Sequence, residues 1–185
     1  MARSLLVLCW IPHGGGEEEF GGFPVALDGL GEGRVEWDAV DLVARNGSGR
    51  PVAIEVKSSA YVQTWSQDRH STPVFGVGAA RQFVAGRLDV KGTRLRRADV
   101  YVFCLLECRD KRTANPLDVA QWSFYVAPRT LVDQVCGSSA TLKLTTLQAH
   151  PGFERVGFDL LRTAVWNAAG DPGPLRESAS RPGGQ

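Results

Sequence analysis

The stretch VARNGSGRPVAIEVK, residues 43–57, constrains the fold more than any other part of this 185-residue chain. Asparagine, glycine and serine gather between two segments of alternating apolar and polar residues. That pattern favours a tight turn between two strands. The sequence therefore predicts a β-hairpin whose strands cover Val35–Ala44 and Pro51–Lys57.

Charged residues lie inside the second predicted strand. Side chains alternate between the two faces of a strand, so Val52, Ile54 and Val56 share the face that we expect in the core. Glu55 and Lys57 share the other face, about 7 Å apart from a rise of ~3.3 Å per residue. A carboxylate and an ammonium group at that separation can both reach one phosphate-sized ligand.

The length of the turn decides whether Asp41 joins them. If Asn46 pairs with Arg50 around a three-residue loop, 47–49, Asp41 lies opposite Glu55 on the same face. A two-residue loop would shift the register by one residue and turn Asp41 to the other face. The sequence allows both, and we take the three-residue loop as the hypothesis.

Two carboxylates beside a lysine form a hard, oxygen-rich site that suits Mg²⁺ or Mn²⁺. Such an ion lowers the pKa of a bound water and neutralises charge on a phosphodiester. A lysine can orient or deprotonate the attacking water, or stabilise the transition state. The alternative is a solvated salt bridge on an exposed strand face, worth at most about 1 kcal/mol.

The spacing D-x13-E-x-K on two strands joined by a turn resembles the PD-(D/E)XK nuclease superfamily. The segments WDAVDL, VAIEVKSSAYVQTW, ADVYVFCLL and NPLDVAQWSFYV are similar to a bacterial branch of it, over roughly residues 35–166. The resemblance implies an α/β fold with a restriction-endonuclease-like core, a central mixed β-sheet flanked by helices. It also implies a Mg²⁺-dependent or Mn²⁺-dependent DNA endonuclease.

By the same resemblance Asp41 and Glu55 would be metal ligands, and Lys57 the catalytic lysine. The backbone carbonyl of Val56 would face the metal. Gln63 is a weaker candidate for positioning water or DNA.

The chain departs from the superfamily pattern at its start. The acidic helix that usually opens the core is not predicted for residues 12–33, where glycines surround Glu17, Glu18 and Glu19. Asp38 is predicted to be a surface or loop carboxylate. Two other functions stay open: a nucleic-acid-binding module whose site has decayed, and an interaction domain in which the charged residues form only ion pairs.

A basic segment, RLDVKGTRLRR, lies between the hairpin and the next apolar run. Its local charge excess is +4 in a chain whose formal net charge is +1. Phosphate contacts dominate nonspecific DNA affinity, so it is a candidate DNA contact. A solvated loop or helix end is the equal alternative. The basic residues are Arg87, Lys91, Arg94, Arg96 and Arg97.

The remaining chain predicts one α/β domain at 34–169, between a poorly structured leader, 1–33, and a disordered tail, 170–185. Tyr61 and Trp65 could pack against bases or sugars, but an aromatic residue after a core strand usually caps the core, and we predict that role. Trp166 is predicted to lie in the core. The other predicted elements are a helix at Gly78–Leu88, strands at Ala98–Glu107, Gln121–Ala127 and Thr141–Leu147, and helices at Arg129–Val135 and Phe158–Ala169.

Composition narrows the class of protein. The four cysteines form no CxxC pair and no stretch reaches the ~20 apolar residues of a membrane span, so we expect reduced thiols, a cytoplasmic location and no membrane partner. We expect DNA as the partner and no small-molecule cofactor. Enzymes of the resembled type often dimerise, and the sequence leaves a homodimer open.

Overall fold

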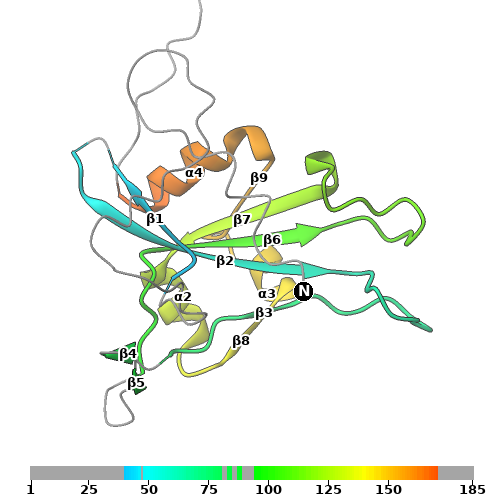
Figure 1. Ribbon diagram of the computed structural model, residues 1–185, viewed down its shortest axis with the longest axis horizontal. Helices are drawn as coiled ribbons and strands as arrows, with labels where there is room; N and C mark the ends of the chain where they lie inside the picture. Colours follow the sequence, from blue (N-terminus) through cyan, green and yellow to red (C-terminus); the bar gives the residue numbers. More distant parts are fainter. Residues whose placement is uncertain (1–39, 47, 81–82, 85–86, 89–93, 171–185) are drawn as a thin grey trace, which may run out of the picture.

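The computed structural model describes residues 40–46, 48–80, 83–84, 87–88 and 94–170, with backbone alone for 83–84 and 87–88. These residues form a mixed α/β fold around a five-stranded sheet (Figure 1). The predicted leader and residues 171–185 of the predicted tail lie outside them.

The five-stranded sheet has the order β1-β2-β6-β7-β9. The β2–β6 pair is parallel, whereas β1–β2, β6–β7 and β7–β9 are antiparallel. Two small antiparallel sheets, β3–β8 and β4–β5, accompany it. The strands are β1 (Leu42–Arg45), β2 (Pro51–Ala60), β3 (Val74–Gly76), β4 (Phe83–Val84), β5 (Arg87–Leu88), β6 (Val100–Leu106), β7 (Trp122–Pro128), β8 (Thr141–Lys143) and β9 (Glu154–Val156).

Helices and the β3–β8 pair cover the two faces of the main sheet. Helix α4 packs on one face, and α2, α3 and β3–β8 pack on the other (Figure 1). Two hydrophobic clusters result, one on each side of the sheet. The helices are η1 (Val119–Gln121), α2 (Arg129–Cys136), α3 (Leu144–Ala149), η2 (Phe158–Leu160) and α4 (Leu161–Ala168).

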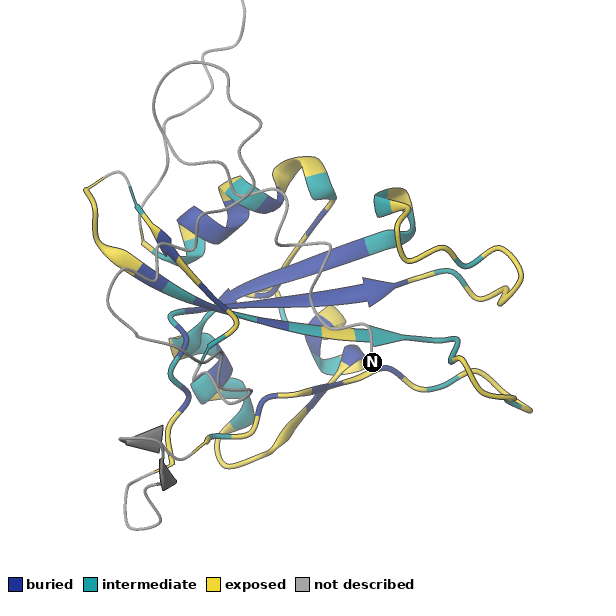
Figure 2. Cartoon of the chain, viewed as in Figure 1, coloured by how far each residue is buried: buried dark blue, intermediate teal, exposed yellow. Residues whose placement is uncertain are grey.

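Burial differs between the central strands and β2. All of β6 is buried, as expected of an apolar strand covered on both faces. In β2, Val52, Ile54 and Val56 are buried in the cluster under α4, as predicted. Glu55 and Lys57 alternate with them and are only partly buried, on the face that β2 shares with Tyr101 and the second cluster. Figure 2 shows partly buried stretches along β2 beside the fully buried β6.

Most of the predicted elements are confirmed. Strand β2 begins at Pro51 as predicted and runs three residues beyond Lys57. Strands β6 and β7 and helices α2 and α4 lie within two or three residues of their predicted bounds, and Trp166 is buried. Of the first predicted strand, β1 begins only at Leu42, and residues 35–39 lie outside the described part.

One predicted helix was wrong, and one predicted strand was too long. The helix expected at Gly78–Leu88 is replaced by a bridge between Ala80 and Leu95 and by the β4–β5 pair. The segment holds Val84 and Gly86, both weak helix formers, and a glycine between short apolar segments is a turn signal.

The strand expected at Thr141–Leu147 begins at Thr141 as predicted but is shorter, because it ends at Lys143 and α3 follows at once. Leu144 and Leu147 are both buried, and their three-residue spacing puts them on one helical face. No helix in the described part of the chain is long and apolar enough to cross a membrane.

Candidate active site at the β1–β2 hairpin

The hairpin has the predicted three-residue loop. Leu42 pairs with Ile54 and Arg45 with Pro51, so the next position along places Asp41 opposite Glu55. The turn closes through a hydrogen bond from the Asn46 N–H to the Arg50 carbonyl at 3.0 Å. The register hypothesis is therefore confirmed, with Asp41 just before the first residue of β1.

The side chain of Asn46 determines the shape of this turn. Its Oδ1 accepts hydrogen bonds from the N–H and hydroxyl of Ser48, at 3.2 and 2.8 Å, and from the N–H of Arg50 at 2.7 Å. Gly49 has a φ of +80°, which non-glycine residues rarely adopt. The NGSG sequence thus selects the loop length that sets the register.

Asp41 bonds to the backbone of β2. Its Oδ2 accepts a hydrogen bond from the Val56 N–H at 2.8 Å. The chain bends at residues 40–41, and the side chain of Asp41 takes the place of a strand partner for this N–H. One carboxylate is therefore turned toward β2 rather than away from it.

Glu55 and Lys57 meet in an ion pair between Lys57 Nζ and Glu55 Oε1. Both side chains are partly buried, with 19% of Glu55 and 30% of Lys57 exposed. The sequence placed them on one face with room for a ligand between them. The structure instead joins them directly, so a ligand would compete with the ion pair.

The pKa of Glu55 is raised above its ordinary value of 4.5. Burial is the main cause, and the negative charge of Asp41 acts in the same direction. The ammonium of Lys57 and the backbone of Asp41 lower this pKa but do not offset the burial. Glu55 is therefore an ionisable group whose charge is only partly compensated, which is common at functional sites.

Tyr101 is a neighbour that the sequence analysis did not single out. It is the Cα partner of Glu55 on β6, and it is 4% exposed. Burial raises its pKa to about 12, and the charge of Glu55 adds to the rise. The signal in the sequence was the one hydroxyl inside the apolar run VYVFCLL, visible only once β2 and β6 are paired.

The donor set fits a hard divalent cation. Asp41 and Glu55 supply carboxylate oxygens, and Mg²⁺ commonly takes one or two carboxylates and keeps several waters. The described residues contain no group of three or more His, Cys, Asp or Glu side chains that could hold a metal ion. The N–H of Val56 donates to Asp41, and the role of its carbonyl stays a prediction.

Gln63 lies in the loop after β2 and folds back on the strand end. Its Nε2 donates to the Ala60 carbonyl at 3.2 Å, and its N–H donates to Gln67 Oε1 at 2.6 Å. Ala60 itself is about 10 Å beyond Lys57 at ~3.3 Å per residue. No contact links Gln63 to the two carboxylates in the described part of the chain, and its predicted role stays a prediction.

The basic segment divides into different environments. Lys91 and the side chain of Arg87 lie outside the described residues. Arg94 is exposed, and its Nε donates to the Ala79 carbonyl at 3.0 Å. Arg97 is partly buried, and its Nε has no hydrogen-bond partner among the described residues.

Arg96 is buried and engaged inside the protein. Its Nε donates to the Val77 carbonyl at 2.6 Å, and its Nη1 contacts Asp133 Oδ1 and the Gly137 carbonyl, both at 2.9 Å. Its Nη2 donates to the Ser139 carbonyl at 2.9 Å. This guanidinium is not offered to phosphate, and we leave Arg96 out of any nucleic-acid interface.

Comparison of the chain with protein-family models, curated proteins and solved structures found no match. The functional interpretation therefore depends on the geometry of this hairpin and its surroundings.

Proposed function

We propose that this protein is a metal-dependent DNA endonuclease that hydrolyses phosphodiester bonds on a restriction-endonuclease-like core. The observation that carries the proposal is the hairpin register, which brings Asp41 to the position opposite Glu55 beside the ammonium of Lys57. The mixed sheet with helices on both faces agrees with the proposed fold.

In this proposal Asp41 and Glu55 hold Mg²⁺ or Mn²⁺, and the Val56 carbonyl is a further candidate ligand. When bound, the ion would supply charge neutralisation at the phosphodiester and a more acidic water. Burial of Glu55 favours such binding, because a partly desolvated carboxylate gains more from a cation than an exposed one does.

Lys57 would have two roles, one before and one after the cation and substrate bind. Without substrate its ammonium compensates part of the charge of Glu55. With the carboxylates bound to a cation, the same ammonium is free to turn toward a phosphate oxygen and stabilise the charge that develops there. Because 30% of Lys57 is exposed, the phosphate backbone of a bound DNA can reach its ammonium group.

The test is relaxation of supercoiled plasmid in the presence of Mg²⁺ or Mn²⁺. Lys57→Met and Asp41→Asn should each lower the cleavage rate at least about 100-fold, as expected for loss of a transition-state contact. Lys143→Met, at an exposed position in β8, is the matched control and should cleave like the wild type. Lack of cleavage by the wild type on plasmid, or full activity in Lys57→Met, would refute the proposal.

Metal binding has a readout apart from activity. A ligand that binds only the folded state raises its stability, so Mg²⁺ or Mn²⁺ should raise the Tm of the wild type in a concentration-dependent way. Asp41→Asn and Glu55→Gln should remove that rise. An equal rise in all three proteins would place the metal elsewhere.

The second candidate is a nucleic-acid-binding module of the same fold without catalysis. It is favoured by the direct Glu55–Lys57 ion pair and by the lack of a third metal-ligating side chain beside Asp41 and Glu55 among the described residues. Binding of DNA by the wild type without any cleavage would select this candidate.

A further inference from the structure

Two loops leave the same end of the sheet. Loop 61–71 follows β2, and loop 107–118 follows β6. Because β2 and β6 are parallel, both loops start at the carboxyl ends of neighbouring strands (Figure 1). We call these two segments the loop pair.

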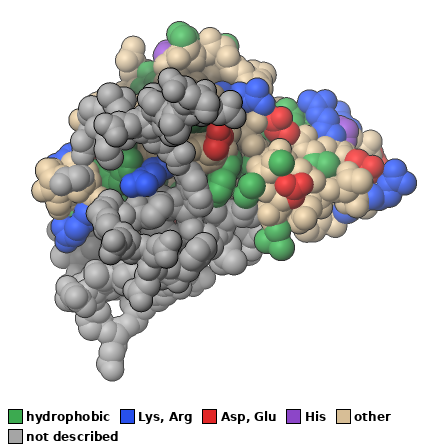
Figure 3. Space-filling view, turned by 90° about the horizontal axis from the view of Figure 1, so that it is seen from above, with side chains coloured by type: hydrophobic (Ala, Val, Ile, Leu, Met, Phe, Trp, Pro, Cys, Tyr) green, Lys and Arg blue, Asp and Glu red, His purple; other side chains and the backbone are tan. Residues whose placement is uncertain are grey.

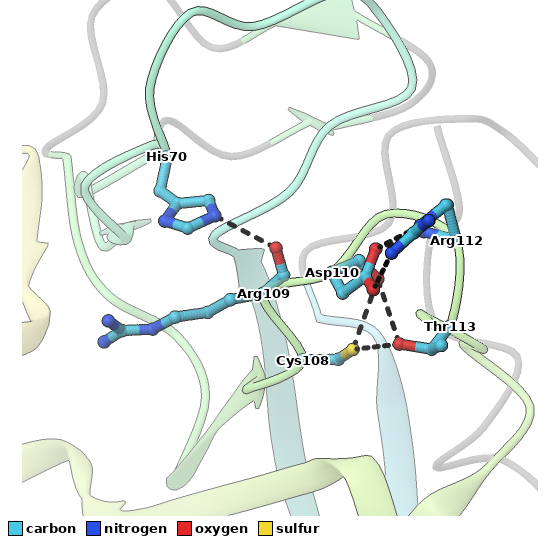
Figure 4. A network of polar contacts seen from close by, with 6 residues as sticks. All are labelled: His70, Cys108, Arg109, Asp110, Arg112 and Thr113. Atoms are coloured by element: carbon cyan, nitrogen blue, oxygen red, sulfur yellow. Dashed lines mark hydrogen bonds and ion pairs between the residues drawn. The ribbon is translucent and has the colours of Figure 1, made fainter.

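The loop pair is joined by contacts that cross between its two segments. Lys111 Nζ donates to the Thr64 and Trp65 carbonyls, at 2.8 and 2.9 Å. His70 Nε2 contacts the Arg109 carbonyl at 2.9 Å (Figure 4), and the Arg109 guanidinium lies 4.2 Å from the centre of the Tyr61 ring. The two loops therefore hold each other in place.

Each loop is also organised internally. Gln67 accepts from the Gln63 N–H and donates to the Ser71 hydroxyl at 3.0 Å. In the other loop, Asp110 accepts from the Arg112 N–H at 2.9 Å, beside the thiol of Cys108 (Figure 4). Few degrees of freedom remain to be lost when a ligand binds to such a surface.

Trp65 is 64% exposed on this surface. We predicted that it caps the core, and that prediction was wrong, whereas Tyr61 does pack against a core cluster. The carbonyl of Trp65 is held by Lys111, so the residue is exposed on an ordered segment. An indole presented in this way is a platform for a flat ligand.

The loop pair carries equal numbers of acidic and basic side chains, but not all of them form ion pairs. Glu107 forms an ion pair with Arg155, and Asp110 forms one with Arg112. Asp118 uses its carboxylate to accept the Ala120 N–H. Among the described residues no carboxylate forms an ion pair with these three cations of the loop pair: Arg69, Arg109 and Lys111.

All three of these cations are exposed, and Asp68 is the neighbouring acid without a cationic partner in the described part. Figure 3 shows basic side chains and a histidine gathered at the narrow end of the molecule, with acidic ones among them. Exposed cations on the same two loops as an exposed aromatic ring suit a phosphate backbone with accessible bases.

We propose that the loop pair binds an unpaired strand of nucleic acid, with a base stacked on Trp65 and phosphates contacted by Arg69 and Arg109. The choice of nucleic acid as partner rests on the proposed function. Strand β2 carries Glu55 and Lys57 and leads directly into this surface. A nucleic-acid strand bound at the loop pair would therefore lie at the end of the β-strand that carries the proposed active site.

The test is fluorescence anisotropy of the full-length protein with a labelled oligothymidylate in EDTA, where cleavage is stopped. Trp65→Ala should weaken binding about tenfold or more, and Trp65→Phe should retain most of it, because stacking needs a ring. Arg69→Gln should lower the salt dependence by about 0.7 in the log–log slope. Val43→Ala, a similarly exposed apolar residue on β1, is the control and should bind like the wild type.

Equal affinity of Trp65→Ala and wild type, or no binding by the wild type, would overturn the inference. The two assays separate it from the proposed function, because cleavage of plasmid is measured with Mg²⁺ or Mn²⁺ and binding of oligothymidylate is measured in EDTA. If Trp65→Ala loses binding although the wild type cuts nothing, the loop pair is supported and the nuclease proposal fails. If cleavage is metal-dependent and Trp65→Ala binds normally, only the loop-pair inference fails.

Discussion

Two charged groups lie partly inside this protein, and they differ in how completely they are paired. Arg96 is buried, with each of its three guanidinium nitrogens bonded to a carbonyl or carboxylate. Glu55 has one ammonium partner, and burial still raises its pKa. The first group joins the ends of α2 and β8 to the segment before β6, and the second faces Asp41 at the sheet edge.

The comparison teaches how to separate structural from functional charges. A buried charge that is bonded through each of its nitrogens has little left to offer a ligand, and its removal takes a donor away from several acceptors at once. A charge that is only partly compensated keeps the capacity to bind a cation. By this criterion Arg96 belongs to the scaffold, although the sequence grouped it with DNA-binding candidates.

The largest effect should come from Arg96→Met. This substitution removes the donor to the Val77, Gly137 and Ser139 carbonyls, and it leaves the Asp133 carboxylate with its 3.7 Å contact to Arg129. We expect a loss of about 2–3 kcal/mol in the free energy of unfolding, because four hydrogen bonds to a buried guanidinium are lost. Urea denaturation followed by circular dichroism measures it.

The matched control for Arg96 is Arg94→Met in the same segment. Arg94 is exposed and makes one hydrogen bond, to Ala79, so its loss should change the free energy of unfolding by about 0.5 kcal/mol or less. Equal effects of the two substitutions would contradict the distinction drawn here.

Glu55→Gln should have a smaller effect of opposite sign that depends on pH. Because the folded-state pKa is above 4.5, the stability contribution of Glu55 is complete below pH 4.5 and is lost as pH rises through the raised pKa. Glutamine does not ionise, so the variant escapes that loss. The free energy of unfolding of Glu55→Gln relative to wild type should therefore rise between pH 4 and pH 7 in metal-free buffer.

Chemical denaturation at several pH values checks this sign. A relative stability that stays flat or falls over that range would mean that Glu55 is as well compensated as Arg96, and the comparison would lose its basis.

Gly49→Ala should cost about 1 kcal/mol, because an L residue at φ +80° is strained. No atom lies within 4 Å of a Cβ at this position, so strain is the whole effect. Gly76→Ala in β3 has equally open space without a positive φ, and should be neutral or slightly stabilising. Thermal unfolding of both variants tests how much the stability of the turn depends on Gly49.

The hairpin shows what the sequence could predict. Its register follows from local turn residues and from alternation along β2. The sequence allowed two loop lengths, and the structure has the one that places Asp41 opposite Glu55. The apolar run of β6 likewise predicts a strand buried on both faces. Local patterns reduced these features to few alternatives because few residues determine them.

What the sequence could not supply is pairing over long distances. Arg96 has a structural role because it bonds to Asp133, Gly137 and Ser139. Nothing in its own segment of the sequence predicts these partners. Tyr101 joins the site only because β2 and β6 pair in parallel. Trp65 is exposed on a backbone that Lys111, in the loop after β6, holds through the Trp65 carbonyl, whereas its position after a core strand favours a core role.

The smallest effect should come from Glu107→Gln. Glu107 and Arg155 form an ion pair at 2.8 Å, but their side chains are 41% and 58% exposed, so water competes with the contact. Arg155 also keeps its hydrogen bond to the Ser123 hydroxyl at 2.9 Å when Glu107 is neutralised. The change in the free energy of unfolding should stay below about 0.5 kcal/mol and shrink further in 1 M salt. A loss comparable to that of Arg96→Met would mean that exposure does not separate charged side chains that stabilise the fold from those that do not. The number of contacts each one makes would then have to replace burial as the criterion.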